Sequence, residues 1–291
     1  MRQDDMRAGT ESDGRPFQAR MTEEAAQFHA FGYIVIRQCL DSEHVAALQN
    51  AHTCEMANAP SYDYFGAGGT RMSRRYIDQH PAFGALVEHP HVLAMMRDID
   101  GTEFLFSGSG DMWSNFDDTP WHTDGVPGKE FPSAKIAVYL DDMDETSGAL
   151  RVIPGSNHPQ FCSALFQASG VWDDGRPRLQ IPPDEVPGAV TIATAPGDVV
   201  LWDNRLWHYA PRRPDGLPRR ALFISYFRDP GDDMVARGVL HRLYKSMHPA
   251  NQYIYSRTLL QHPTPARERM ATRLEALGIE NVREAPEIIH T

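Results

Sequence analysis

The stretch GDVVLWDNRLWHYAP, residues 197–211, indicates the kind of fold that this chain adopts. Gly197 and Asp198 favour a turn, and the VVLW that follows is typical of a strand because it is rich in β-branched and aromatic side chains. Asp203 and Asn204 then favour a second turn. A short strand bounded by turns on both sides is typical of all-β sandwiches and barrels.

Comparable runs recur from about residue 103 onwards. They are EFLFSGSGDMW (103–113), AKIAVYLDD (134–142), ALRVIPG (149–155), AVTIATA (189–195) and RALFISYFR (220–228). The runs are separated by turn residues, whereas alternating βα units would have helices between their strands. We therefore expect an all-β core over about 103–229. The chain as a whole is then one domain over 20–291, mainly β with flanking helices.

The segments on either side of this core have helical patterns at 20–100 and at about 232–291. Thr22 is expected to cap a first helix that ends at Gly32, and Asp41 to cap a second. Two segments are rich in glycine or proline. Residues 61–75 are expected to form a loop, and residues 156–187 are expected to form a long insertion or lid over the core. Residues 1–19 lack periodicity and are expected to form a mobile arm.

Composition excludes several classes of function. The formal net charge of −11 over 291 residues argues against nucleic acid or an anionic membrane surface as a partner. The chain has no long apolar run and a polar N-terminus, so we expect a cytoplasmic protein. Cys39, Cys54 and Cys162 form no C-x-x-C pair and are expected to be free thiols. His89 and His91 have metal-like spacing but stand at an expected helix start, so we expect no metal there.

The motif PWHTDG (120–125) places His122 and Asp124 two positions apart. The spacing alone is uninformative, because 13 histidines and 39 acidic residues produce such a triplet by chance. At a strand end, however, residues i and i+2 point to the same side. His208, after the turn at 203–204, is the best third ligand. Two histidines and a carboxylate form the facial triad of non-haem Fe(II) oxygenases; a solvated turn and a core histidine are the alternatives.

An arginine pair begins the run at 219–228. An arginine at the mouth of a barrel can bind a carboxylate through two parallel hydrogen bonds. Strand alternation sends Arg219 and Arg220 to opposite faces, and the residues alone leave the choice open. By the same alternation Lys135 and Tyr139 share a face, so either can contact cosubstrate or substrate, or serve packing instead.

The strand before the motif supplies two further candidates. Trp113 and Met112 are candidates for the wall of a substrate pocket, with a place in the structural core as the alternative.

Taken in order, four motifs resemble the phytanoyl-CoA dioxygenase-like family of Fe(II)/2-oxoglutarate-dependent oxygenases. They are WHTDG (121–125), LDDMDETSGALRVIPGSNH (140–158), GDVVLWDNRLWH (197–208) and PRRALFISY (218–226). The early segment F-x-x-F-G-Y-I-V-I (28–36) matches as well, so the resemblance runs from about Thr22 to Arg228. In the family's usual turn a histidine follows serine directly, whereas Asn157 intervenes here. The resemblance implies a double-stranded β-helix core, also called a jelly roll or cupin-like fold.

The resemblance also implies a site and a chemistry. His122, Asp124 and His208 would bind Fe(II), and Arg219, which follows His208 by eleven positions, would bind 2-oxoglutarate, with Arg220 as runner-up. Dioxygen and 2-oxoglutarate would be consumed, with release of succinate and CO2, while an unactivated carbon is oxidised. Halogenating relatives replace the carboxylate with a small residue, so Asp124 favours hydroxylation.

The expected substrate is a small molecule, either a natural product of secondary metabolism or another small metabolite, because no lysine-rich patch marks a coenzyme A site. Desaturation, cyclisation or epoxidation by the same centre remain open, as does a monomer or a homodimer. A cupin-like divalent-metal hydrolase or isomerase is the alternative from another class, but it has no evident need for Arg219. A catalytically silent binding protein would have no reason to keep all four site residues.

Overall fold

The computed structural model describes most of the chain between residues 22 and 278. The described residues are 22–58, 64–65, 69–73, 76–125, 133–173, 176–186, 188–229, 231–238, 255 and 257–278. The mobile arm expected at 1–19 lies outside them, and so do parts of the segments expected at 61–75 and 232–291.

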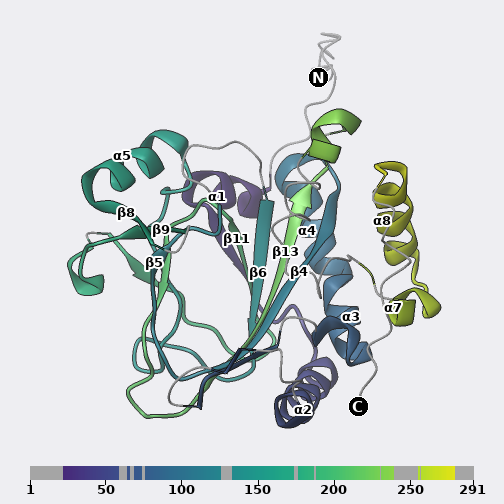
Figure 1. The fold of residues 1–291 in the computed structure, drawn as a ribbon, viewed down its shortest axis with the longest axis horizontal. Coiled ribbons are helices and arrows are strands. Elements are labelled where there is room, and N and C mark those ends of the chain that lie inside the picture. Colours follow the sequence, from purple (N-terminus) through teal and green to yellow (C-terminus); the bar gives the residue numbers. More distant parts are fainter. Residues whose placement is uncertain are drawn as a thin grey trace, which may run out of the picture.

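Two antiparallel sheets face each other and form the core (Figure 1). Within the described residues the larger sheet has seven strands, in the order β1 (Tyr33–Ile36), β11 (Val199–Asp203), β6 (Ser133–Tyr139), β13 (Arg219–Arg228), β4 (Phe104–Asn115), β3 (Arg71–Ser73) and β2 (Tyr64–Phe65). The smaller sheet has six, in the order β10 (Val190–Thr191), β7 (Arg151–Val152), β12 (His208–Ala210), β5 (Thr119–His122), β9 (Arg176–Leu179) and β8 (Gly170–Asp173). This arrangement confirms the predicted mainly β jelly roll with flanking helices.

Helices cover the outer face of the larger sheet. They are α1 (Glu23–Phe31), α2 (Ser42–Asn58), α3 (Pro81–Val87), α4 (Pro90–Asp100), α7 (Arg257–Gln261) and α8 (Pro265–Ala276), with the 3-10 turn η2 (Tyr76–Asp78). A second 3-10 turn, η3 (Pro183–Glu185), lies by the smaller sheet, where Asp184 pairs with Arg151 of β7. Figure 1 shows α3 between the sheet and α8, on the side away from the smaller sheet. No helix within the described ranges is long and apolar enough to span a membrane.

Strand alternation separates the hydrophobic core from the interior of the jelly roll. In β6, Ile136 and Val138 pack into the large cluster under the helices, whereas Ala137 and Tyr139 pack between the two sheets. The same period of two applies along β13 and β4, which pair with each other and with β6 or β3. One face of each strand therefore supplies stability, and the other lines the space where a ligand can enter.

The expected helix ends are present. The Thr22 hydroxyl accepts a hydrogen bond from the Ala25 amide at 3.1 Å, and the Asp41 carboxylate accepts one from the His44 amide at 2.7 Å. Gly32 ends α1 with a φ of 82°, and a Cβ there would come within 2.6 Å of the side chain of Asn157. Both the backbone conformation and this close approach therefore require glycine.

The segment 156–187 has more regular structure than a loop-like lid. It forms α5 (Pro159–Ser169) and the hairpin of β8 and β9, and β9 pairs with β5 where Arg178 stands opposite His122. The segment 61–75, expected to be a loop, contributes β2 and β3, and β3 pairs with β4 at the sheet edge. Both segments therefore extend sheets, and the hairpin reaches the strand that carries the first expected ligand.

Candidate metal centre

Three of the expected site residues converge between the sheets. His122 is the last residue of β5 and His208 the first of β12; the two stand directly opposite each other, with ring centroids 4.1 Å apart. Asp124 follows two positions after His122, and its Oδ2 lies 3.6 Å from the Nε2 of His208. One ligand atom from each of the three residues lies within 4.8 Å of the others. Cross-strand pairing and the two-residue period thus bring one cluster together.

Hydrogen bonds fix how the two imidazoles face. The Nδ1 of His122 lies 2.8 Å from the carbonyl of Pro120, and that of His208 lies 2.9 Å from the carbonyl of Leu206. A carbonyl can only accept, so each Nδ1 carries the proton and donates it. Each Nε2 is then left with a lone pair, which is the arrangement that metal-binding histidines use.

Electrostatics suit a cation at this cluster. Burial lowers the pKa of His208, and burial with the adjacent His208 lowers the pKa of His122 well below its usual range, so both rings are neutral. Burial alone would raise the pKa of Asp124, but Lys135 and the two imidazoles outweigh it and lower the pKa. The Lys135 ammonium donates to Oδ1 of Asp124 at 3.0 Å. The cluster therefore presents two neutral lone pairs and one carboxylate.

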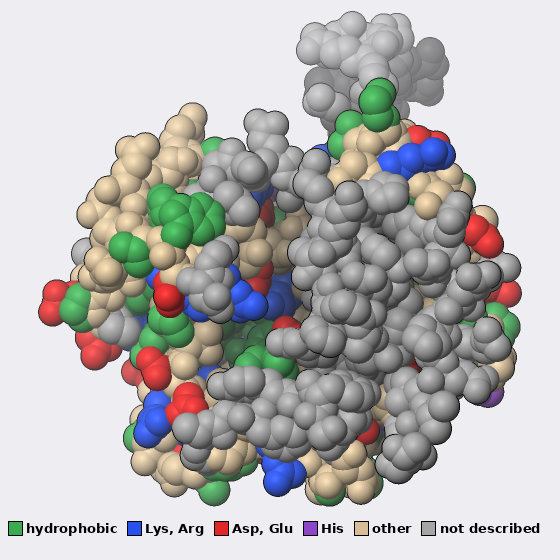
Figure 2. Space-filling view, viewed as in Figure 1, with side chains coloured by type: hydrophobic (Ala, Val, Ile, Leu, Met, Phe, Trp, Pro, Cys, Tyr) green, Lys and Arg blue, Asp and Glu red, His purple; other side chains and the backbone are tan. Residues whose placement is uncertain are grey.

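The cluster opens into a cavity of about 520 Å³ between the two sheets. Figure 2 shows a hollow on this face where basic, acidic and hydrophobic side chains meet. The cavity is lined by the three clustered residues and by others from both sheets, among them Trp113, Asn115, Lys135, Tyr139, Trp202, Arg219 and Phe223. This volume suits a small molecule.

Arg219 is a buried cation at the wall of this cavity. Only 3% of it is exposed, and its guanidinium donates to the carbonyls of Pro211 at 2.7 Å, Gly148 at 3.0 Å and Asp117 at 3.3 Å. No carboxylate pairs with it among the residues that the structure describes. Burial lowers its pKa. A buried charge without a counter-ion is costly, so the site favours an anionic ligand.

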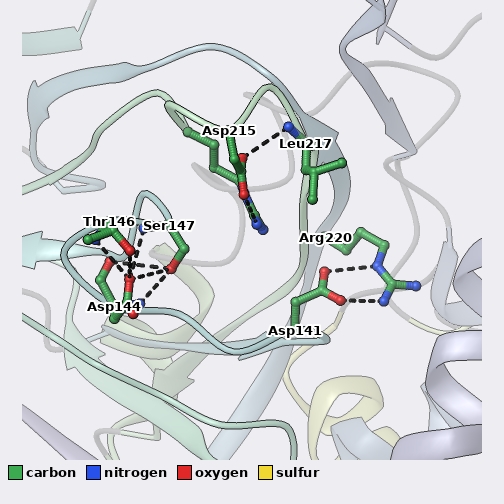
Figure 3. Close-up of polar contacts among 8 residues, drawn as sticks. Asp141, Asp144, Thr146, Ser147, Asp215, Leu217 and Arg220 are labelled. Carbon is green, nitrogen blue, oxygen red and sulfur yellow. Dashed lines mark hydrogen bonds and ion pairs between the residues drawn. The ribbon is translucent and has the colours of Figure 1, made fainter.

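Arg220 faces the other way. Its Nε donates to Oδ2 of Asp141 at 2.9 Å and its Nη2 to Oδ1, which makes a two-pronged ion pair (Figure 3). It is not among the residues that line the cavity. Alternation along β13 therefore turns Arg219 inward and Arg220 outward.

Of the other residues that the sequence offered for the site, three line the cavity and one does not. Trp113, Lys135 and Tyr139 line the cavity, although Lys135 contacts Asp124 directly. Met112 does not line it: the residue is fully buried in the cluster under the helices, on the opposite face of β4. That placement overturns the expectation that Met112 walls the pocket, because adjacent strand residues point to opposite faces.

Sequence analysis missed one supporting residue, Ser156. It is fully buried, and its hydroxyl accepts a hydrogen bond from the Trp207 amide at 2.9 Å, one residue before His208. The signal was present in the SNH of residues 156–158, which follows a turn glycine. What the sequence did not reveal was the partner, 51 positions away.

The phytanoyl-CoA dioxygenase (PhyH) family pattern matches residues 28–221, which is two thirds of the chain and includes the three clustered residues and Arg219. The chain belongs to the PhyH family. The sequence-based recognition of a PhyH-like oxygenase is thereby confirmed.

Relatives of this PhyH protein include ectoine dioxygenase of Bordetella bronchiseptica, which is 26% identical over 246 residues, 74% of this chain and 77% of the relative. Among solved structures, the epimerase SnoN in complex with Fe3+, alpha ketoglutarate and nogalamycin RO has a TM-score of 0.57 and 20% identity, over 70% of this chain and 82% of that one. EctD from S. alaskensis with 2-oxoglutarate and 5-hydroxyectoine has a TM-score of 0.52 and 21% identity, over 70% and 74%.

The residues of this PhyH protein fit both iron and 2-oxoglutarate. The free Nε2 atoms of His122 and His208 and the ionised Asp124 are a suitable donor set for Fe(II). Near Arg219, the Tyr139 hydroxyl is buried without a hydrogen-bond partner among the described residues, and burial raises its pKa to about 12, so it can donate. A guanidinium and a vacant hydroxyl donor together suit a carboxylate.

Proposed function

We propose that this protein is a non-haem Fe(II)/2-oxoglutarate-dependent dioxygenase that hydroxylates an unactivated carbon of a small molecule. The observation that carries the proposal is the convergence of His122, Asp124 and His208 within 4.8 Å at a cavity that also holds an uncompensated Arg219. The three residues would hold the metal on one side and leave positions open for cosubstrate and dioxygen. Bound Fe(II) would supply dioxygen activation, with 2-oxoglutarate leaving as succinate and CO2.

The protein's own residues would position the reactants. Arg219 and Tyr139 would bind the distal carboxylate of 2-oxoglutarate, because both reach the cavity and both have donor capacity to spare. Arg220, already paired with Asp141, would not. Lys135, which donates to Asp124, would keep that carboxylate ionised and aligned. Trp113 is proposed as part of the substrate wall.

The proposed substrate is a natural product or another small metabolite. The cavity of about 520 Å³ mixes aromatic with charged side chains, which suits a compact polar ligand. Hydroxylation is the proposed outcome because Asp124 occupies a coordination position that a halide would need. Desaturation, cyclisation and epoxidation stay as alternatives: neighbours of the same fold include a carbocyclase and an epimerase, so the fold alone leaves the outcome open.

The domain organisation, the cellular compartment and the partners are proposed as well. Residues 20–291 would act as one oxygenase domain, with 1–19 as an arm and the α5–β9 region as a cover for the cavity. Cys39, Cys54 and Cys162 form no disulfide, which suits the reducing cytoplasm. No nucleic acid or membrane partner is proposed, because the net charge is −11.

The metal assignment is tested by anaerobic addition of Fe(II) and 2-oxoglutarate. The native protein should develop a weak visible metal-to-ligand charge-transfer band, and His122→Ala and His208→Ala should lose it. The matched control is His158→Ala, whose ring lies 3.3 Å from the carbonyl of Ala30, away from the cavity, and which should keep the band. A native protein without the band, or a His122→Ala protein that keeps it, would refute the assignment. Succinate release over a panel of compounds then identifies the substrate.

A further inference from the structure

A second group of metal-ligand side chains lies outside the cavity. Cys39 is in the turn between β1 and α2, His89 immediately precedes α4, and His91 is in the first turn of α4. One ligand atom from each lies within 4.8 Å of the others, and the Sγ of Cys39 is 3.6 Å from the Nδ1 of His89. None of the three lines the cavity of the iron cluster.

The orientation of His89 is unusual for its position. His80, which precedes α3 in the same way, uses its Nδ1 to accept a hydrogen bond from the Ala82 amide at 3.1 Å and so caps the helix. His89 makes no such capping bond. Its ring instead approaches Cys39 and lies 5.5 Å from the ring of His91 between centroids. The imidazole is therefore directed at the cluster rather than at the helix end.

We propose that Cys39, His89 and His91 form a second metal site, selective for Zn²⁺ and distinct from the iron centre; the position of Cys39 reverses the expectation from sequence that His89 and His91 bind no metal. Tetrahedral zinc with ordinary Zn–S and Zn–N bonds sets sulfur and nitrogen ligands about 3.6 Å apart. The Cys39–His89 pair already has this separation, at 3.6 Å. A thiolate with two imidazoles favours zinc, whereas the iron cluster offers no sulfur.

The surroundings suit a site that an ion can enter. Cys39 is only 6% exposed, His89 is half-buried and His91 is exposed, so the cluster opens to solvent on one side. His44 lies beside His89, with ring centroids 5.9 Å apart, but it is not part of the group whose ligand atoms lie within 4.8 Å of one another, so water would fill the fourth position. Burial and then Asp198 raise the pKa of Cys39 to about 11, so zinc displaces a proton when it binds.

The bound ion would join two parts of the helical layer. Cys39 belongs to the connection that leaves the edge strand β1, while His89 and His91 begin α4, which packs on α1 and β4. A ligand that binds the folded state alone stabilises it by mass action. The role assigned to this zinc is therefore structural, and catalysis does not require it.

Cobalt titration of the full chain tests the site, because only a sulfur ligand gives an intense near-ultraviolet thiolate-to-Co²⁺ band. The native protein should show this band with one equivalent of Co²⁺, and Zn²⁺ should abolish it. Cys39→Ser should lose the band, whereas Cys54→Ser, which removes an exposed thiol outside the cluster, should keep it. Because the iron cluster contains no cysteine, it cannot contribute to this signal.

A variant at the exposed ligand guards against misfolding of Cys39→Ser. His91→Ala should retain the native melting profile and weaken Co²⁺ binding at least tenfold. Absence of the band in native protein would overturn the proposal and leave Cys39 and His89 as a thiol–imidazole hydrogen bond. A band that survives Cys39→Ser, or that is unchanged by His91→Ala, would overturn it as well. The Fe(II)/2-oxoglutarate band reports separately on the proposed oxygenase.

Discussion

At the scale of single residues, two buried arginines show how a binding site differs from a structural contact. Arg219 and Arg267 are 3% and 5% exposed. Arg267 donates to both oxygens of Glu88, which neutralises it. Arg219 donates to three backbone carbonyls, which engage three of its five N–H groups and leave its charge uncompensated. The difference predicts that an anion completes the Arg219 environment.

The two neighbouring arginines of β13 should therefore have unequal effects. Arg219→Gln removes charged hydrogen bonds worth about 1.5–3 kcal/mol, so the KM for 2-oxoglutarate should rise roughly 10- to 100-fold. Arg220→Gln is the matched control, because it breaks an ion pair with Asp141 outside the cavity, and should change this KM less than about threefold. Steady-state succinate release at varied 2-oxoglutarate measures both, and a larger effect for Arg220→Gln would exchange their roles.

At this scale the sequence could predict which residues would bind the metal, but not which face of its strand every side chain occupies. A histidine and a carboxylate two apart, with a second histidine after a turn, are recognisable because strand period fixes their geometry. Alternation also shows that Arg219 and Arg220 point opposite ways. Which one points inward depends on Asp141, a partner 79 positions away from Arg220. The face of β4 that is covered by the helices likewise depends on distant segments, so the sequence did not show that Met112 lies on it.

At the scale of elements, Ser156 holds the start of β12 in place. Its replacement by alanine leaves the buried Trp207 amide without an acceptor, which should lower the free energy of unfolding by about 1–3 kcal/mol. Because His208 follows directly, Fe(II) affinity should fall as well. Urea unfolding and the charge-transfer titration measure the two effects. Ser169→Ala, which removes a bond to the Leu165 carbonyl at a helix end, should cost less than about 0.5 kcal/mol. Equal costs for both would contradict this role of Ser156.

Asp198 fastens the end of β1 to the turn before β11. Its carboxylate accepts hydrogen bonds from the amides of Gln38 at 2.9 Å and Ala195 at 3.1 Å and from Arg37 at 2.7 Å. Burial would raise the pKa of Asp198, but these hydrogen bonds outweigh it and lower the pKa. A carboxyl with a lowered folded-state pKa stabilises the protein above its unfolded pKa of about 3.9, and that stability disappears as pH falls through the folded value.

The carboxylate should therefore show its contribution in a pH series. Asp198→Asn should lower the free energy of unfolding by about 2 kcal/mol at neutral pH. The gap between native and variant should narrow below about pH 4, as the native carboxyl takes up its proton. Urea unfolding from pH 7 to pH 3 measures the gap at each pH. A gap that stays constant over this range would show that the carboxylate charge is not what stabilises the junction.

The hairpin of β8 and β9 shows where element prediction from sequence fails. Residues 176–179 are RPRL; charged and apolar residues alternate, but the run is only four residues long and contains a proline, so local propensity opposes a strand. The segment is a strand because the exposed edge of β5 supplies a pairing partner at His122. By contrast, the runs that became β6, β11 and β13 could be predicted, since each is buried and rich in β-branched or aromatic residues.

At the scale of the whole molecule, the larger sheet separates two tasks. Its inner face lines the cavity, while its outer face carries the helices and the hydrophobic cluster that includes α8 residues Met270 and Leu274. Changes on the outer side should therefore alter stability without altering the affinity for cosubstrate. The convergence of Cys39 with His89 also belongs to this scale, because a pair 50 positions apart meets only once the helices have packed.

The ion pair between Glu88 and Arg267 tests this separation, because it joins α8 to the connection between α3 and α4, with only 6% of each side chain exposed. Arg267→Met alone strands a buried carboxylate and should lower the free energy of unfolding by about 3–5 kcal/mol. Glu88→Leu alone should cost a similar amount, whereas the double variant should cost much less than the sum, since no charge is left unpaired.

Urea unfolding of the native protein, the two single variants and the double variant measures this coupling. The KM for 2-oxoglutarate should stay within about twofold in the double variant, because the pair lies outside the cavity. Additive costs would mean that the pair is solvated rather than buried, and a large rise in KM would mean that the outer layer shapes the cavity after all.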